Sequence, residues 1–171
     1  MTPPAVFAYD EHHDPTVDID RWVALAEHVL ATEGIVDGEL TLAFVDEAEM
    51  ARLNEEHMGD DHATDVLSFP LDADLAIAEP RAPRAADAAP ILLGDVVVCP
   101  SVAATNALEH AGTIDDELAL LIVHGILHVL GHDHLDADET ARMQARERVL
   151  LERHHWNGPA PVTFAAHRAS S

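Results

Sequence analysis

The sequence predicts a single domain that contains both strands and helices, on the basis of its length, its composition and two alternating hydrophobic periods. The 171 residues suffice for one ordinary domain with a sizeable core. Hydrophobic residues make up 48% of the chain and aromatic residues only 4%, so we expect an aliphatic core. Strand-like and helix-like spacings of apolar residues follow one another along the chain. We therefore expect one domain over residues 1–156 and a flexible tail over residues 157–171.

The individual elements follow from these patterns and from the turn residues between them. Strands are predicted at residues 6–9, 39–45, 64–70 and 92–100, where apolar residues alternate or run continuously. Helices are predicted from residue 19 to a stop at Gly34, from 46 to about 56, from 101 to about 110, from about 113–115 to 130, and from 136 to about 154. Residues 71–90, rich in Ala, Pro and Asp, are expected to form a long surface loop.

Most of the predicted helices begin with a residue that can cap their N-terminus. Short polar side chains at this position accept a hydrogen bond from an otherwise unpaired backbone N–H. The expected capping residues are Asp18, Asp46, Ser101 and Asp136. Glu49 and Glu139 follow two of these residues at the spacing of a capping box, which strengthens both helix starts.

The charge balance limits the possible partners. The chain has 32 acidic and 9 basic residues, for a formal net charge of -23, and every basic residue is Arg. Such a field repels polyanions at long range, which argues against nucleic acid. However, an acidic surface is also an adaptation to high salt, and a bound divalent cation reverses the sign of the potential inside a cleft. The charge therefore lowers the expectation of a nucleic-acid substrate without excluding one.

The sequence carries no signal for export or for a membrane. Cys99 is the single cysteine, so no internal disulfide can form, and no basic segment followed by an apolar segment opens the chain. The longest apolar run, residues 118–123, is far too short to cross a bilayer. We expect a cytoplasmic protein that has no membrane partner.

The segment HGILHVLGHDH, residues 124–134, has the histidine spacing of a metal site. His124 and His128 are four residues apart, so on a helix both rings project from one face and can share one ion. Gly131 can adopt the left-handed conformation that ends a helix, which would bring His134 back over the same face. We predict that His124, His128 and His134 bind one metal ion and act in catalysis through it.

Three histidine ligands would leave one coordination position open, and this position predicts hydrolytic chemistry. An open fourth position is typical of catalytic rather than structural zinc sites. A divalent ion there lowers the pKa of its water to about 7 and polarises a carbonyl or phosphoryl oxygen. Imidazole ligands favour Zn²⁺, although nickel, iron or copper would also bind.

Three positions next to the predicted ligands bear on the mechanism. Asp133 is a candidate catalytic residue that either orients a ligand imidazole or caps the turn. His132 is either a solvated neighbour or an additional proton carrier. Gly125 occupies the place of the glutamate that serves as general base in zinc peptidases of the H-E-x-x-H type, so peptidase activity is not expected.

The segments TDVLSFP (residues 64–70), LLGDVVVCP (92–100) and HGILHVLGHDH together resemble the YbeY family of bacterial metal-dependent endoribonucleases. The match covers roughly residues 39–153 in the same order. The resemblance implies a small α+β domain, with a four-stranded mixed sheet packed against several helices and the metal site on a central helix. It also implies metal ligands at His124, His128 and His134, and a substrate cleft lined by Ser68 and its neighbours.

The resemblance further implies a zinc-dependent endoribonuclease that prefers single-stranded RNA and acts in ribosomal RNA maturation and ribosome quality control, with ribosomal proteins as further partners. Three positions depart from the family pattern. Met58 stands where many members have an arginine that contacts RNA phosphate, Ala63 replaces a common proline, and His132 replaces a frequent tyrosine. The remaining candidates for phosphate contact are Arg52 and the arginines of the last predicted helix, although an exposed helical arginine more often pairs with nearby glutamates.

Two other functions stay open at this point. The acidic charge and Met58 favour a metallohydrolase of another substrate class. A non-catalytic ribosome-assembly factor, whose metal holds the motif loop against its helix, is the other alternative.

Overall fold

A four-stranded mixed sheet forms the centre of the computed structural model, which describes residues 4–11, 13–15, 17–77, 85–133 and 135–164. The strands are β1 (Ala5–Asp10), β2 (Glu39–Phe44), β3 (Val66–Pro70) and β4 (Leu92–Val98), in the spatial order β1-β2-β4-β3. The first three strands in this order are parallel, and β3 pairs antiparallel with β4. The predicted α+β fold with a mixed sheet is therefore confirmed.

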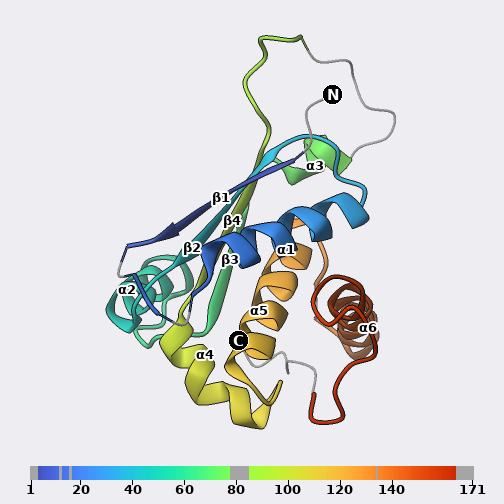
Figure 1. Cartoon of the computed structure of the whole chain (residues 1–171). Coiled ribbons are helices and arrows are strands. Elements are labelled where there is room, and N and C mark those ends of the chain that lie inside the picture. The colour runs from blue at the N-terminus through green and yellow to red at the C-terminus, as the bar shows by residue number, and fades with distance from the viewer. Residues whose placement is uncertain (1–3, 12, 16, 78–84, 134, 165–171) are drawn as a thin grey trace.

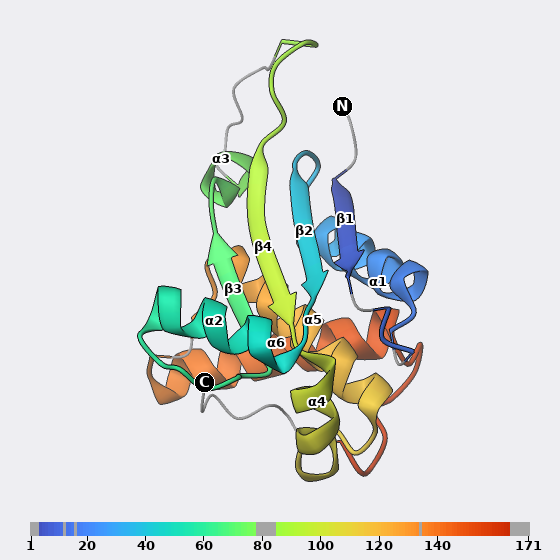
Figure 2. The same cartoon turned by 90° about the vertical axis from the view of Figure 1, so that its left-hand side faces the viewer.

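Helices cover both faces of this sheet (Figures 1 and 2). The helical segments are α1 (Ile19–Thr32), α2 (Glu47–Met58), α3 (Ala73–Ile77), α4 (Pro100–Asn106), the 3-10 turn η1 (Ala107–Glu109), α5 (Ile114–Val129) and α6 (Ala137–His154). The main core lies between the sheet and helices α1, α5 and α6. A second, smaller core forms where α2 packs against the other face, around Met50, Leu67, Val97 and Cys99.

Helix α5 is buried on nearly all sides because it lies between the sheet and the other helices. It contacts β3 and β4 on one side and α1, α4 and α6 on the others. Its residues 117–127 are all buried, which accounts for the uninterrupted apolar sequence from Leu118 to Val123. A helix that is apolar all round requires such a position. The histidine motif therefore begins on the most firmly packed element of the fold.

Three of the four expected helix caps are confirmed, and Thr113 caps a further helix in the same way. The side chains of Asp18, Asp46, Thr113 and Asp136 each accept a hydrogen bond from the backbone N–H three residues later. The expected cap at Ser101 is wrong. Helix α4 begins at Pro100, and the Ser101 hydroxyl donates instead to Glu47 Oε2 at 2.7 Å. Helix α4 also ends at Asn106, and η1 completes the segment that was expected to be helical up to His110.

The segment 71–90 is not entirely loop, since the short helix α3 occupies part of it. Ala73 and Ala76 are buried against the sheet, which explains why this turn is ordered, and residues 78–84 lie outside the described residues. Beyond α6, the ring of Phe164 packs edge-on against Trp156 at a centroid distance of 4.9 Å. In the part of the chain that the structure describes, no helix is both long and apolar enough to span a bilayer.

Candidate functional site

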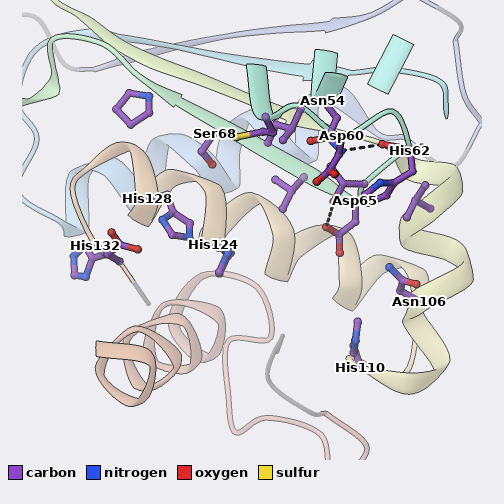
Figure 3. Close-up of a pocket in the computed structure, with 18 of the residues that line it drawn as sticks. Asn54, Asp60, His62, Asp65, Ser68, Asn106, His110, His124, His128 and His132 are labelled. Carbon is purple, nitrogen blue, oxygen red and sulfur yellow. Dashed lines mark hydrogen bonds between the residues drawn. The ribbon is translucent and has the colours of Figure 1, made fainter. Parts of the chain in front are cut away.

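A cleft of about 1100 Å³ lies beside the histidine motif (Figure 3). One wall is the end of α5 and the turn after it. The opposite wall is the segment from Met58 to Pro70, which includes the loop after α2 and strand β3, and the far end is formed by α4 and η1. This volume slightly exceeds the roughly 300–1,000 Å³ of pockets that hold small molecules. The polar lining residues are Asn54, Asp60, His62, Thr64, Asp65, Ser68, Asn106, Glu109, His110, His124, His128, His132 and Asp133.

His124 and His128 lie on one face of α5, as their spacing predicts. Their Nε2 atoms are 3.1 Å apart, and their rings meet edge to face with centroids 4.6 Å apart. Both rings line the cleft, in which Figure 3 shows them next to each other. The two nitrogens thus converge on the same small volume.

A glutamate of helix α6 fixes the first of these rings. His124 Nδ1 lies 2.7 Å from Glu147 Oε1, and both residues are buried. Because an ionised carboxylate only accepts hydrogen bonds, the Nδ1–H of His124 donates to it, and the lone pair of the neutral ring is then on Nε2. Among the described residues, Glu147 Oε2 has no hydrogen-bond partner, so the carboxylate forms a hydrogen bond with the histidine only.

The histidine pair fits a zinc ion. Two nitrogens at about 2.0–2.1 Å from one tetrahedral zinc lie about 3.3 Å apart, close to the observed separation of 3.1 Å. A carboxylate behind a ligand histidine is also the usual support of such sites. The third predicted ligand, His134, lies outside the described residues, and within these residues no group of three His, Cys, Asp or Glu is placed to hold a metal.

The turn after α5 has the predicted conformation. Gly131 has φ of 101°, in the left-handed region, and its N–H donates to the carbonyl oxygen of His128 at 3.0 Å. The N–H of His132 donates to the carbonyl of Leu127 at 2.9 Å, which completes a Schellman motif. The chain therefore reverses directly after the helix, and the side chains of His132 and Asp133 line the cleft.

The glycine in the place of a peptidase glutamate is required by packing. A Cβ atom on Gly125 would lie 2.6 Å from Val96 Cγ1 and 3.2 Å from Ser68 Oγ. The Ser68 hydroxyl donates to the Gly125 carbonyl at 3.2 Å, so helix and sheet are in direct contact at this point. A larger residue would therefore require the Val96 side chain or the helix to shift. The close approach of helix and sheet is thus a second reason for glycine at position 125, beside the absence of a peptidase base.

The wall opposite α5 is anchored at two buried polar residues and is exposed between them. Asn54 is buried and donates from Nδ2 to the carbonyl oxygen of His62 at 2.9 Å, which ties the loop to α2. Asp65 is also buried, and its carbonyl accepts from the N–H of Cys99 at 2.9 Å. Between these anchors, Asp60 and His62 are exposed, and Met58 is 55% exposed. Ser68 lines the cleft, as expected from the family resemblance.

The arginines suggested as phosphate contacts do not line the cleft. Arg52 bonds both Glu49 and Glu56 on the surface of α2, at distances of 2.7–2.9 Å. The hydrogen bond to Glu49 raises the pKa of Arg52 above its ordinary value, so the guanidinium stays charged and paired. On α6, Arg146 pairs with Glu33 and Arg148 with Glu152. Among the described cleft residues there is no Arg or Lys, whereas four are Asp or Glu.

Two buried glutamates behind the cleft were not predicted from the sequence. Glu147 bonds a histidine 23 residues earlier, a separation at which no local pattern exists. Its signal is its place on the apolar stripe of α6, between Met143 and Leu150 at helical spacing. Glu117 occupies a similar place on α5 and bonds His110 at 3.1 Å. An acidic residue on a buried stripe therefore marks a candidate partner for a histidine.

Comparison with known structures first defines the class of fold. The solution structure of TM1509 from Thermotoga maritima matches with a TM-score of 0.55 and 24% sequence identity, over 89% of this chain and 93% of that one. The two proteins share the fold of a small α+β domain.

Comparison of sequences then defines the family. The family model described as Endoribonuclease YbeY matches residues 8–155. Proteins named Endoribonuclease YbeY are 45% identical in Salinispora tropica, over 79% of this chain and 87% of the relative, and 47% identical in Acidothermus cellulolyticus, over 79% and 84%. This chain belongs to the YbeY family.

Proposed function

We propose that this protein is a zinc-dependent endoribonuclease that prefers single-stranded RNA and acts in the maturation of ribosomal RNA and ribosome quality control in the cytoplasm. Its relatives are named endoribonucleases, which supports the reaction class. The observation that carries the proposal is the pair of Nε2 atoms 3.1 Å apart at the wall of a large cleft, with a buried carboxylate behind one ring. This arrangement suits a metal-assisted hydrolase better than a binding module.

In this proposal His124, His128 and His134 hold one zinc ion per chain. When bound, a divalent cation there supplies a Lewis acid and lowers the pKa of water. Glu147 keeps the Nδ1–H of His124 engaged, so that Nε2 faces the cleft as a ligand. Asp133 and His132 lie on the same turn, where they can hold or move a proton near the scissile phosphate.

The form of the cleft supports a single strand as substrate. Its walls are separate segments that carry polar side chains, including the amides of Asn54 and Asn106. Unstacked nucleotides can form hydrogen bonds with such groups. The four carboxylates of its lining repel phosphate, so a cation in the cleft is needed to offset them. Ribosomal RNA and ribosomal proteins are the partners that we propose for this site.

A cleavage time course with an end-labelled, unstructured RNA tests this function. Wild type, His128→Ala and the control His28→Ala are purified identically and assayed at low and moderate salt, with zinc content measured for each. His28 is exposed on α1, stacked on His154, and does not line the cleft. We expect cleavage by wild type and His28→Ala and none by His128→Ala.

Other results would change the assignment. Equal cleavage by all three proteins would identify a contaminating nuclease. A wild type that binds stoichiometric zinc without cutting RNA would favour the metallohydrolase of another substrate class or the assembly factor.

A further inference from the structure

An amide and a carboxylate lie one helical turn apart at the end of the cleft away from the histidine motif. Asn106 is the last residue of α4, Glu109 is the last residue of η1, and both line the cleft. In a 3-10 helix, side chains three residues apart project from the same side. In Figure 3, Asn106 lies at one end of the cleft and His128 and His132 at the other. Asn106 and Glu109 therefore face the cleft together, away from the predicted metal ligands.

The Glu109 carboxylate is free to meet a ligand of the cleft. Glu109 is exposed, and it has no hydrogen bond or ion pair with another described residue. The side chain of Asn106 does not cap η1. An ionised carboxylate only accepts hydrogen bonds, so a ligand at this place must offer donors. The phosphates of a nucleic acid offer none, whereas several base edges do.

The two groups match the Watson–Crick edge of guanine. This edge presents the acceptor O6 beside two neighbouring donors, N1–H and N2–H₂. The carboxylate of Glu109 can accept from both donors, and the amide of Asn106 can donate to O6. The corresponding edges of adenine, cytosine and uracil offer a carboxylate a single donor group beside an acceptor. Guanine is therefore the base that forms the most hydrogen bonds with this pair.

We infer that Glu109 and Asn106 bind an unpaired guanine of the RNA and that this contact determines where the RNA is positioned for cleavage. This inference rests on the proposed function and names the base that the cleft selects. Unpaired bases in single-stranded RNA are recognised through hydrogen bonds to this edge. Because the pair lies at the end of the cleft away from His128, the guanine is a nucleotide other than the one that is cleaved.

The test uses single-stranded RNAs that differ at one position outside the cleavage site, which carries guanine, inosine or adenine. Inosine keeps O6 and N1–H but lacks the N2 amino group. A good bidentate contact discriminates between bases by about five- to hundredfold. At one position along the substrate, we expect the wild type to have a KM lower by about this factor for guanine than for adenine. Inosine should be intermediate, and kcat should change little.

Glu109→Gln removes the acceptor for two donors and also one negative charge, and these two effects have opposite signs. We expect the guanine preference to disappear, while the KM for the adenine RNA stays the same or falls because repulsion of the backbone is reduced. The control Glu27→Gln changes an exposed carboxylate of α1 outside the cleft and should keep the wild-type preference.

Asn106→Ala tests the amide separately. It should raise the KM for guanine and inosine alike, since both carry O6, and leave the ratio between them unchanged. Thermal unfolding of each variant checks that it is folded.

The guanine contact is refuted if the wild type cleaves RNA with the same KM for all three bases at every position. It is also refuted if Glu109→Gln lowers the KM equally for guanine, inosine and adenine, because the carboxylate would then only repel the backbone. A wild type that does not cleave RNA would instead overturn the proposed function, and this inference with it.

Discussion

The two long walls of the cleft differ in how firmly their polar groups are held. On the α5 wall, His124 is buried, Glu147 supports it from behind, and Gly125 is pressed against the sheet. On the opposite wall, Met58 and the loop that follows are exposed. Under the proposed function, the groups that hold the metal would be on a packed helix and those that contact the substrate on a loop. The departures from the family pattern at Met58 and Ala63 are on the loop side.

The largest effect is expected at the support of the α5 wall. Glu147→Gln retains an acceptor for the Nδ1–H of His124 but removes the carboxylate charge behind the ring. We expect zinc affinity, measured by competition with a chelator, to fall by about ten- to hundredfold. The matched control is Glu152→Gln on the same helix, which loses an ion pair with Arg148 only. If both variants bind zinc like wild type, the rigidity of this wall does not serve the metal.

A second substitution tests the packing of the same wall. In Gly125→Ala, the new Cβ would overlap Val96 Cγ1, and overpacking of this kind costs about 1–3 kcal/mol. Alanine recovers about 0.5–1 kcal/mol because it is the better helix former. Net destabilisation should therefore appear in denaturant unfolding. Adding Val96→Ala should make the Gly125→Ala step less costly, and additive effects of the two changes would disprove the proposed overlap.

The exposed wall should instead accept a new charge. Met58→Arg places a cation at the cleft without disturbing buried groups, since Met58 is exposed. We expect tighter RNA binding at low salt, with a plot of log K against log salt that is steeper by about 0.7 for one phosphate contact. Val149→Arg, on an exposed position of α6 outside the cleft, adds the same charge as a control. An equal effect of both would show that net charge alone is responsible.

The smallest effect is expected for the reactivity of Cys99, which lies in the small core beneath the exposed wall. Cys99 is fully buried under α2, and burial raises the pKa of its thiol above the ordinary value. The thiol should therefore stay protonated and react slowly with a disulfide reagent at neutral pH. If the α2 layer opens independently of α5, labelling should proceed faster than global unfolding. Labelling that occurs only at the rate of global unfolding would show that both walls are equally stable.

The sequence was sufficient for those features that depend on neighbouring residues. The caps at Asp18, Asp46 and Asp136, the left-handed Gly131 and the placement of His124 and His128 on one helix face all depend on local spacing, and the structure has each of them. The mixed sheet came from the family resemblance. The metal set itself stays a prediction, since His134 lies outside the described residues.

The features that were missed depend on contacts between distant elements. Serine is a residue type that commonly caps helices, but the Ser101 hydroxyl donates a hydrogen bond to Glu47 of another helix instead. Glu147 and Glu117 form hydrogen bonds with His124 and His110 only once α6 and η1 pack around α5. Similarly, helix α3 lies in the segment expected to be a loop. Burial of Ala73 and Ala76 stabilises it, whereas the local sequence has no strong helical pattern. Contacts between distant elements therefore overrode the local sequence preference in each case.

The strand order also has a consequence for how the molecule folds. Strand β2 pairs directly with β4, although the chain between Phe44 and Leu92 carries α2, β3 and α3. This pairing therefore closes one long loop, and β3 joins the sheet only at its edge. Closing such a long loop is entropically costly, but the cost grows only slowly with its length. The sheet of β1, β2 and β4 with α5 can therefore form first, and β3 can add to its edge afterwards. Pulse-labelling of amide hydrogens during refolding should then show protection in β2 and β4 before β3. The two histidines of α5 that line the cleft would then be in place before the chain completes the opposite wall.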